Sequence, residues 1–261
     1  MQYHAINSNI VQSMLTDHRK QLLLARLSAE GQIIASAIAA ELGISEDTIR
    51  RDLRELAAEG RLTRVHGGAL PASPAIAPLD QRRSIATPEK IRLAHAALQL
   101  IQPGQTIFID GGTTHAELIR AFPATLSATI VTHSPTIAAA LEPFRQVEVI
   151  LIGGRLFRHS MVAVGTDAAD AIRRLRFDLL FLGVTGLHPD AGLTTGDYEE
   201  AAIKRTLVGQ AADCVVLATS DKLGAVSPHQ ITAASALTRL IISTDHAPTA
   251  RTSYAADVIA A

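Results

Sequence analysis

One segment of the chain has the composition of an anion-binding turn, with two glycines between an aspartate and two threonines. It consists of Asp110, Gly111, Gly112, Thr113 and Thr114. Glycines let backbone amides approach an anion closely, and a hydroxyl at a helix start adds a donor beside the positive end of the helix dipole. Lys222 is the expected cation, and phosphate binding is the chemistry that this set predicts. The same turn is equally compatible with a plain strand-to-helix connection.

Other polar turns follow short apolar segments in the same half of the chain. Their candidate ligand contacts are Thr132, His133, Ser134, Gly153, Gly154, Thr185 and Gly186. A helix expected over 198–211 adds Glu200 and Lys204, which stand four residues apart. These two side chains would form either an exposed ion pair worth about 0.3 kcal/mol or part of the rim of a binding site.

Arginines gather on one face of another predicted helix, residues 46–59. Its apolar residues Ile49, Leu53 and Leu56 follow helical spacing and predict the buried face. The candidate DNA contacts at and after this helix are Ser45, Thr48, Arg50, Arg51, Arg54, Arg64 and His66. Arginine can pair with guanine or with a backbone phosphate. Because acidic residues interleave the arginines, a solvated face with ordinary ion pairs is the alternative.

The sequence around this helix has the pattern of a winged helix-turn-helix. A helix is expected over 34–42, ending at Gly43, and the Ser45 hydroxyl is suited to cap the next helix. The second helix of such a motif enters the major groove of DNA with its first residues at the base edges. After it, residues 61–65 alternate like a strand and 66–68 supply a tight turn, which predicts a small wing.

The half of the chain from Thr106 onward alternates apolar segments with polar turns and amphipathic stretches. This alternation predicts an α/β domain with a mostly parallel sheet. The expected strands are residues 106–110, 128–131, 147–152, 178–183, 214–218 and 240–243. In an open parallel sheet, ligands bind beyond the carboxyl ends of the strands, and most polar residues of this half lie at those ends.

The predicted organisation is an N-terminal tail over 1–16, a winged helix-turn-helix domain over 17–70, a linker over 71–79 and a ligand-binding domain over 80–261. Three prolines spaced through small residues disfavour both helix and central strand in the linker. The segment 80–100 after it is expected to be helical, with Pro88 in an N-terminal turn and Ile91, Ala94 and Leu98 on one face. The tail is polar, and Met14 is an alternative start of the protein.

Composition limits the classes of function. Of the 261 residues, 48% are hydrophobic, which is ample for a packed core. The 24 Lys and Arg are balanced by 25 Asp and Glu, so a DNA contact must come from a local basic patch. The single cysteine, Cys214, excludes an internal disulfide framework and is expected in the core. No apolar segment approaches the roughly 18 residues of a membrane span, so a cytoplasmic protein is expected.

Both halves of the chain resemble one protein family. Residues 19–70, with Leu42-Gly-Ile-Ser, Thr48-Ile-Arg-Arg-Asp-Leu and Arg64-x-His-Gly-Gly-Ala, resemble the DNA-binding domain of DeoR/GlpR-type bacterial transcriptional regulators. Residues 76–244 resemble the sensor domain of that family through Asp-Gly-Gly-Thr-Thr, Gly-Gly, Asp-x-x-Phe-x-Gly and Glu-x-x-x-Lys elements. The resemblance implies a sensor fold similar to ribose-5-phosphate isomerase and the coenzyme A transferases. Two turns depart from it, because His133 replaces a common asparagine and Thr219 a common aspartate.

The resemblance implies a repressor of a carbohydrate or sugar-derivative catabolic operon. Its implied partners are double-stranded operator DNA and a phosphorylated sugar or related metabolite, with the Asp110 turn at the phosphate or adjacent hydroxyls. An even number of subunits, a homodimer or homotetramer, is expected, with no cofactor, catalytic residue or metal.

Two other functions stay open at this point. A sugar-phosphate isomerase with a DNA-binding extension would need an acid/base pair near the sugar carbons. The candidates are Asp110, Glu200 and Asp221. A metal sensor would have to bring His115, His133 and His159 together purely through the fold, because the histidines lack close ligand spacing.

Overall fold

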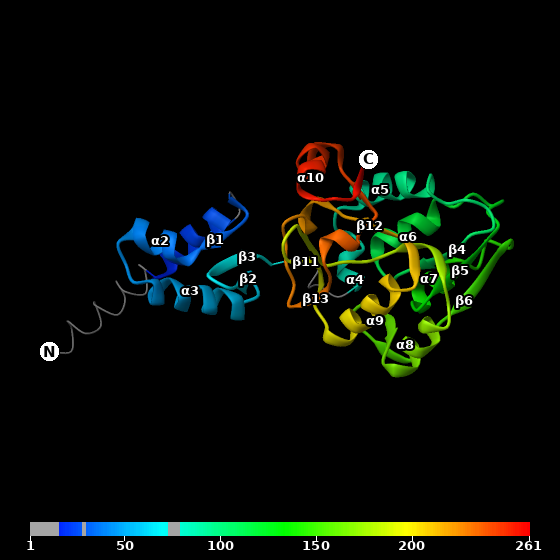
Figure 1. The fold of residues 1–261 in the computed structure, drawn as a ribbon, viewed down its shortest axis with the longest axis horizontal. Helices are drawn as coiled ribbons and strands as arrows, with labels where there is room; N and C mark the ends of the chain where they lie inside the picture. Colours follow the sequence, from blue (N-terminus) through cyan, green and yellow to red (C-terminus); the bar gives the residue numbers. More distant parts are fainter. Residues whose placement is uncertain (1–15, 28–29, 73–78) are drawn as a thin grey trace. The chain divides into compact units, whose positions relative to one another are not determined.

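The protein folds into two compact units (Figure 1). The computed structural model describes residues 16–27, 30–72 and 79–261. Unit 1 comprises Met1–Ser73 with Gly224–Val226, and unit 2 comprises Pro74–Leu223 with Ser227–Ala261. The expectations for the tail over 1–15, including a start at Met14, lie outside the described residues.

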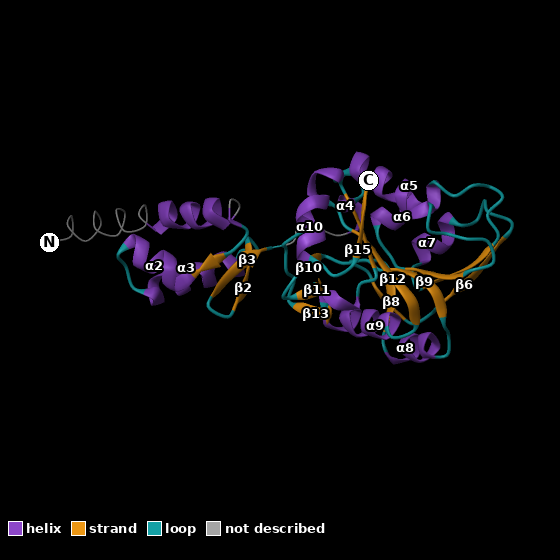
Figure 2. Ribbon diagram, turned by 45° about the horizontal axis from the view of Figure 1, so that its top comes forward, coloured by secondary structure: helices purple, strands orange, loops and turns teal. Residues whose placement is uncertain are grey.

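Unit 1 has the helix-turn-helix and the wing that the sequence predicts. It contains a helix over 16–27, β1 (Ile33–Ile34), α2 (Ala35–Leu42), α3 (Glu46–Ala58), β2 (Leu62–Val65) and β3 (Gly68–Pro71). The strands form one antiparallel sheet in the order β1-β3-β2 (Figure 2). Gly43 ends α2 in the left-handed region, with φ 64. The amide of Thr48 donates to Ser45 Oγ at 3.2 Å, which confirms the predicted cap of α3.

The predicted apolar face of α3 is the buried one. Ile49, Leu53 and Leu56 are at most 1% exposed and pack in one cluster with Leu23 of the first helix and Leu62 of the wing. Burying each such side chain contributes about 1.5–3 kcal/mol of transfer free energy. The opposite face of α3 therefore stays in solvent.

Both ends of the linker expected over 71–79 belong to regular elements. Pro71 is the last residue of β3, where it pairs with Leu62 of β2. On its other side, β3 pairs with β1 only at Gly68 and Ala69, so the missing N–H of Pro71 costs no ladder hydrogen bond there. Leu79 is buried and begins α4 (Leu79–Arg82).

Unit 2 is built on a seven-stranded sheet in the order β15-β14-β12-β9-β4-β5-β6. Every neighbouring pair in it runs parallel. The strands are β4 (Thr106–Ile109), β5 (Ala128–Thr132), β6 (Val147–Leu151), β9 (Phe177–Phe181), β12 (Ala211–Leu217), β14 (Arg239–Ile242) and β15 (Asp257–Ala260). The six predicted strands and the parallel α/β class are confirmed, and β15 at one edge is an addition.

Helices cover both faces of this sheet (Figure 2). The first layer consists of α5 (Thr87–Leu98), α6 (Thr113–Arg120) and α7 (Pro135–Ala140). The second consists of α8 (Thr166–Arg173), α9 (Tyr198–Val208) and α10 (Ala247–Ser253). Short 3-10 helices are η2 (Ser220–Lys222), η3 (Ala234–Ala236) and η4 (Thr244–His246). Two small antiparallel sheets pair β7 (Arg155–Phe157) with β8 (Val162–Val164), and β11 (Gly192–Thr195) with both β10 (Gly186–His188) and β13 (His229–Thr232).

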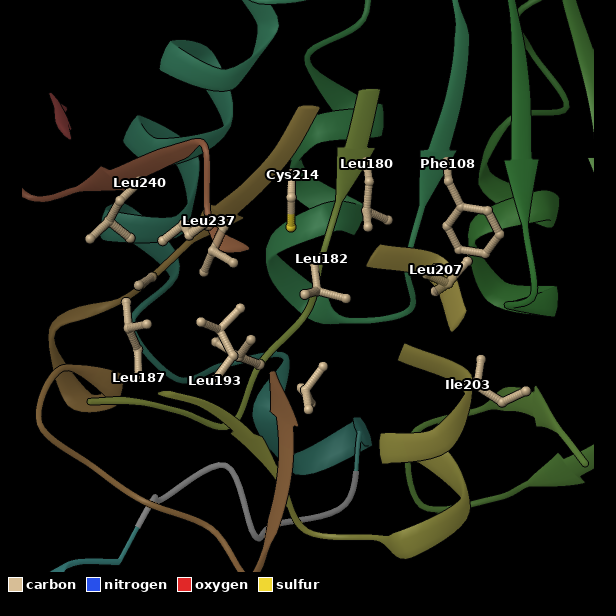
Figure 3. Close-up of a cluster of buried hydrophobic side chains, with 14 of the residues drawn as sticks. Phe108, Leu180, Leu182, Leu187, Leu193, Ile203, Leu207, Cys214, Leu237 and Leu240 are labelled. Atoms are coloured by element: carbon tan, nitrogen blue, oxygen red, sulfur yellow. The ribbon is translucent and has the colours of Figure 1, made fainter. Parts of the chain in front are cut away.

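The pleat of the sheet divides the core of unit 2 in two. In β4, Ile107 and Ile109 face the layer of α5 to α7, whereas Phe108 faces the opposite cluster. Figure 3 shows Phe108 and Cys214 among the leucines of that second cluster. Cys214 is buried as predicted, and burial, with a smaller effect of the Asp213 charge, raises the pKa of its thiol to about 12.

The expectation of a helix over 80–100 needs correction. Two helices, α4 and α5, occupy this segment, and Ala86 between them has a left-handed backbone with φ 51. Pro88 lies in the first turn of α5 as predicted. Leu93 and Ala94 face the core, but Ile91 is 41% exposed, because α5 turns its Leu93 side toward the sheet.

The order of the strands reverses between β4 and β9. From β4 the chain continues to β5 and β6 on one side, and from β9 to β12, β14 and β15 on the other. The crevice beyond the carboxyl ends of the strands at such a reversal is where open α/β sheets bind ligands. The loops after β4, β9 and β12 are the segments that the fold places there.

Candidate functional site

The acidic residues that interleave the arginines of α3 are paired with the first helix. Asp52 is fully buried and accepts from Arg19 Nη2 at 3.0 Å and also from Arg19 Nε. Lys20 Nζ lies 2.9 Å from Glu55 Oε2 and 3.4 Å from Glu59 Oε1. These three carboxylates therefore hold the first helix against α3, and the role of the exposed arginines stays a prediction.

Among the described residues, some of the predicted DNA contacts are hydrogen-bonded to other side chains of the protein, and others are not. Arg50 donates from Nε and Nη2 to Glu46 Oε1, at 2.9 and 2.7 Å. The hydroxyls of Ser45 and Thr48 bond each other at 2.9 Å. Four side chains are exposed and form no hydrogen bond or ion pair with the described part of the chain. They are Arg51, Arg54, Arg64 and His66.

Unit 2 has a pocket at the reversal of its strand order. Eight of the predicted ligand contacts line it. They are Gly111, Gly112, Thr113, Thr114, Thr185, Glu200, Lys204 and Lys222. The sequence did not single out Arg82, Ser160 or Gly183 as ligand contacts, and these also line the pocket, as does His115. Three neighbouring strand ends and the helices α4, α6 and α9 thus contribute to one pocket.

Seven predicted contacts do not lie in the wall of this pocket. They are Asp110, Thr132, His133, Ser134, Gly153, Gly154 and Gly186. The turn after β5 instead holds the loop before β8, because the His133 carbonyl accepts from the Ala163 amide at 2.8 Å and Ser134 Oγ donates to the Met161 carbonyl at 3.0 Å. Polar strand ends in a parallel sheet share one edge, but only those beside the reversal face the pocket.

Asp110 lies behind the pocket and joins its parts. Its Oδ1 accepts from Gly111 N and His133 Nε2, both at 2.7 Å, and its Oδ2 accepts from Lys204 Nζ at 2.7 Å and Gly183 N at 2.8 Å. Burial opposes ionisation of this carboxyl, but the Lys204 charge and the His133 hydrogen bond outweigh it and hold the pKa well below its usual range. Asp110 is therefore an ionised, fully occupied carboxylate.

Glu200 and Lys204 form a buried pair, so the exposed ion pair is excluded. Lys204 Nζ also donates to the Gly183 carbonyl at 2.6 Å and lies 3.4 Å from Glu200 Oε1, while Thr195 donates to Glu200 Oε2 at 2.7 Å. Burial disfavours the ammonium, but Asp110 and Glu200 outweigh that effect and raise the pKa of Lys204. The helix α9 can bury Lys204 because Asp110 supplies a negative charge that compensates the ammonium.

Two histidines lie near Asp110. Both ring nitrogens of His133 face oxygen atoms, Asp110 Oδ1 at 2.7 Å and the Ala163 carbonyl at 2.8 Å. His115 Nδ1 donates to the Asp110 carbonyl at 2.8 Å, and burial lowers its pKa to about 4, which keeps it neutral. No three His, Cys, Asp or Glu side chains of the described ranges group as metal ligands.

Glycines are required where the two central loops approach each other. A Cβ added at Gly111 would lie 2.3 Å from Val162 Cγ1. A Cβ at Gly183 would lie 3.0 Å from Asp110 Oδ2 and 3.1 Å from the Gly111 carbonyl. A side chain at Gly111 would collide with Val162 of β8, and one at Gly183 would press on the Gly111 carbonyl and on the carboxylate of Asp110.

Arg82 and Lys222 are the two cations of the pocket wall that could bind an anion. Nε and Nη2 of Arg82 are buried and have no hydrogen-bond partner among the described residues. Burial lowers the pKa of Arg82, against the opposing charges of Glu200 and Asp110. Burial also lowers the pKa of Lys222, to about 8. The only sequence signal for Arg82 was a pair of arginines, which is equally typical of an exposed helix end.

The chain matches known proteins over both units. Residues 19–74 match the DeoR-like helix-turn-helix domain and residues 85–244 the DeoR C-terminal sensor domain. The HTH-type transcriptional regulator GlpR of Haloferax volcanii is 37% identical, over 81% of this chain and 83% of the relative. The glycerol-3-phosphate regulon repressor of Escherichia coli strain K12 is 31% identical, over 81% of this chain and 84% of the relative.

A solved ribose 5-phosphate isomerase A from Methanocaldococcus jannaschii aligns with 51% of this chain and 53% of its own, with 17% identity and a TM-score of 0.38, too loosely to carry a functional argument. None of the described helices is long and apolar enough to cross a membrane. The two domain matches follow each other in the order of the two units, and the relatives align over most of their length. The chain therefore belongs to the DeoR family of transcriptional regulators.

Proposed function

We propose that this protein represses an operon for the catabolism of a carbohydrate or sugar derivative, and that a phosphorylated sugar or related metabolite in the unit 2 pocket controls its affinity for DNA. The observation that carries the effector proposal is the buried guanidinium of Arg82, whose Nε and Nη2 lack partners. A buried charge without a partner is costly. A phosphate between Arg82 and Lys222 would remove that cost, and the amide of Gly112 in the same wall could add a donor.

The name of one relative supports this class of ligand. The Escherichia coli protein that is 31% identical is a repressor of a glycerol-3-phosphate regulon. A phosphate ester at physiological pH carries nearly two negative charges. Two cations, Arg82 and Lys222, would match that charge.

The exposed side of α3 and the wing is the proposed DNA-binding surface. Arg51 and Arg54 would reach into the major groove or to its phosphates, and Arg64 and His66 would lie along the backbone. The paired Arg50 would contribute less, because it would have to leave Glu46 first. Two such surfaces in a homodimer or homotetramer would meet two half-sites of an operator.

The helix α4 is the proposed link between ligand and DNA. It follows residues 73–78, which continue the chain from β3 of unit 1. Its ends are held by two hydrogen bonds, from the Leu79 amide to the His159 carbonyl at 3.0 Å and from Lys90 Nζ to the Arg82 carbonyl at 2.7 Å. A ligand that draws Arg82 toward the pocket would favour one position of α4 and thereby bias the connection.

The pocket supports binding rather than catalysis. An ionised carboxylate has about four acceptor positions, and Asp110 accepts four hydrogen bonds from its own chain, so it has no position free to take a proton from a substrate. Asp221 is exposed and lines a neighbouring hollow instead of the pocket. An isomerase would need two groups free to exchange protons with the sugar.

Fluorescence anisotropy of DNA from the protein's own upstream region tests the proposal. With the full chain bound, one of a panel of sugar monophosphates should change the DNA affinity at least tenfold. Arg82→Gln should bind the DNA normally and lose the response, whereas the control Arg83→Gln, an exposed neighbour, should keep it. DNA affinity that no phosphorylated compound alters would overturn the effector proposal.

A further inference from the structure

A second hollow adjoins the pocket that contains Arg82 and Lys222, which is called the first hollow below. Ser160, Thr185 and Glu200 line both, so the two lie side by side. The wall of the second hollow includes Phe157, whose ring stacks on His159 with centroids 5.7 Å apart and an interplanar angle of 27°. A ligand held in the first hollow would extend into the second past these three shared residues.

The two hollows differ in charge. Arg82, Lys204 and Lys222 line the first together with Glu200, which pairs with Lys204. The second is lined by the carboxylates of Asp197 and Glu200, and no lysine or arginine among the described residues lines it. Asp197 is fixed in place as the N-cap of α9, because its Oδ1 accepts from the Glu200 amide at 2.9 Å. One end of the site therefore favours an anion, and the other end repels one.

The groups of the second hollow suit a neutral, hydroxylated body. Glu200 Oε2 accepts one hydrogen bond, from Thr195, and a carboxylate oxygen can accept a further one from a hydroxyl. Ser160 is 9% exposed, and among the described residues its hydroxyl contacts only His159 Nδ1, at 3.5 Å, so it can also bond a ligand. The ring of Phe157 offers an apolar surface to carbon–hydrogen groups.

We infer that the effector carries one phosphate, which lies in the first hollow with its hydroxylated carbon chain in the second, and that the charge of Asp197 excludes compounds with a second phosphate at the far end. This inference rests on the proposed function, since it assumes an anion beside Arg82. It adds the orientation of the ligand and the basis for rejecting sugar bisphosphates.

Calorimetric titration of the full-length protein tests the inference with matched pairs of pentose and hexose mono- and bisphosphates, the unphosphorylated sugars and inorganic phosphate. The monophosphate that binds best should do so at least tenfold more tightly than its bisphosphate, its free sugar and inorganic phosphate. Equal or tighter binding of the bisphosphate would overturn the inference and leave the proposed function standing. Binding of no phosphorylated compound would overturn both.

Asp197→Asn gives a gain-of-binding test. The amide oxygen of asparagine can still accept from the Glu200 amide, so the cap of α9 is kept while the charge is removed. The preference for mono- over bisphosphate should shrink at least tenfold, and Asp197→Ser, which also caps helices, should act the same way. The control Asp190→Asn removes an exposed acid outside both hollows and should leave the preference unchanged. An unaltered preference in folded Asp197 variants would contradict the assigned role.

Discussion

Burial makes the ammonium of Lys222 easier to deprotonate than that of a lysine in water. Its pKa lies at about 8 in the unliganded protein, whereas a lysine in water titrates above 10. Below pH 8 the side chain is charged and ready for an anion. Above pH 8 it must take up a proton when a phosphate binds, because the anion stabilises the ammonium.

We expect effector affinity to fall as pH rises above 8, by up to tenfold per pH unit. Below about pH 6 the phosphate ester takes up a proton and also binds more weakly. Calorimetry at pH 7 and pH 9 measures the effect, and Lys222→Gln should bind weakly with no such change. Lys222→Arg, which stays charged, should bind equally at both values. Identical affinity of the wild type at pH 7 and pH 9 would contradict the role of Lys222.

The arginines of α3 should differ in their effect on DNA binding. Arg51→Ala or Arg54→Ala should weaken operator binding by about 1 to 3 kcal/mol, while Arg50→Ala should cost less, because Glu46 occupies its guanidinium. Anisotropy at fixed salt measures this, with circular dichroism to confirm the fold. Arg92→Ala, an exposed change in α5, is the control. Unchanged affinity in both the Arg51 and Arg54 variants would refute the proposed surface.

Elements with a local repeat were predictable, and contacts between distant elements were not. The spacing of Ile49, Leu53 and Leu56 predicts the buried face of α3 from residues within one helix. The burial of Glu200 and Lys204 depends on Asp110, which is 94 residues away from Lys204, so four-residue spacing alone favoured an exposed pair. The availability of Arg82 depends on the break at Ala86 between α4 and α5.

Unit 2 should be sensitive to changes in its buried charges. Lys204→Met leaves Asp110 ionised and without its main counter-charge, which should cost about 3 to 5 kcal/mol of unfolding free energy. Urea denaturation of the full chain, followed by the unit 2 transition, measures the loss. Arg155→Ala, which breaks an exposed pair with Glu199, is the control and should leave the transition unmoved. A stable Lys204→Met protein would mean that Asp110 is not held ionised.

The whole chain joins a DeoR-like helix-turn-helix domain to a DeoR C-terminal sensor domain. The domain matches in the two units predict the same pairing of functions as the sequence patterns did. The even number of subunits stays a prediction, as does the regulated operon. The number of subunits depends on contacts between chains, and the operon depends on the DNA sequence. Patterns within a single protein sequence therefore cannot predict either.

The four hydrogen bonds of Asp110 also bear on how fast a ligand could leave. Three of them fasten the end of β4 to the loop after β9, to the turn after β5 and to α9, so that side of the pocket is fixed. Among the described residues, the short helix α4 and the residue after it are held by burial of Leu79 and by hydrogen bonds of Leu79, Lys90 and Thr87. Entry and exit would then occur by displacement of α4, and the lifetime of the bound effector would set the pace at which repression responds to a changing supply of metabolite.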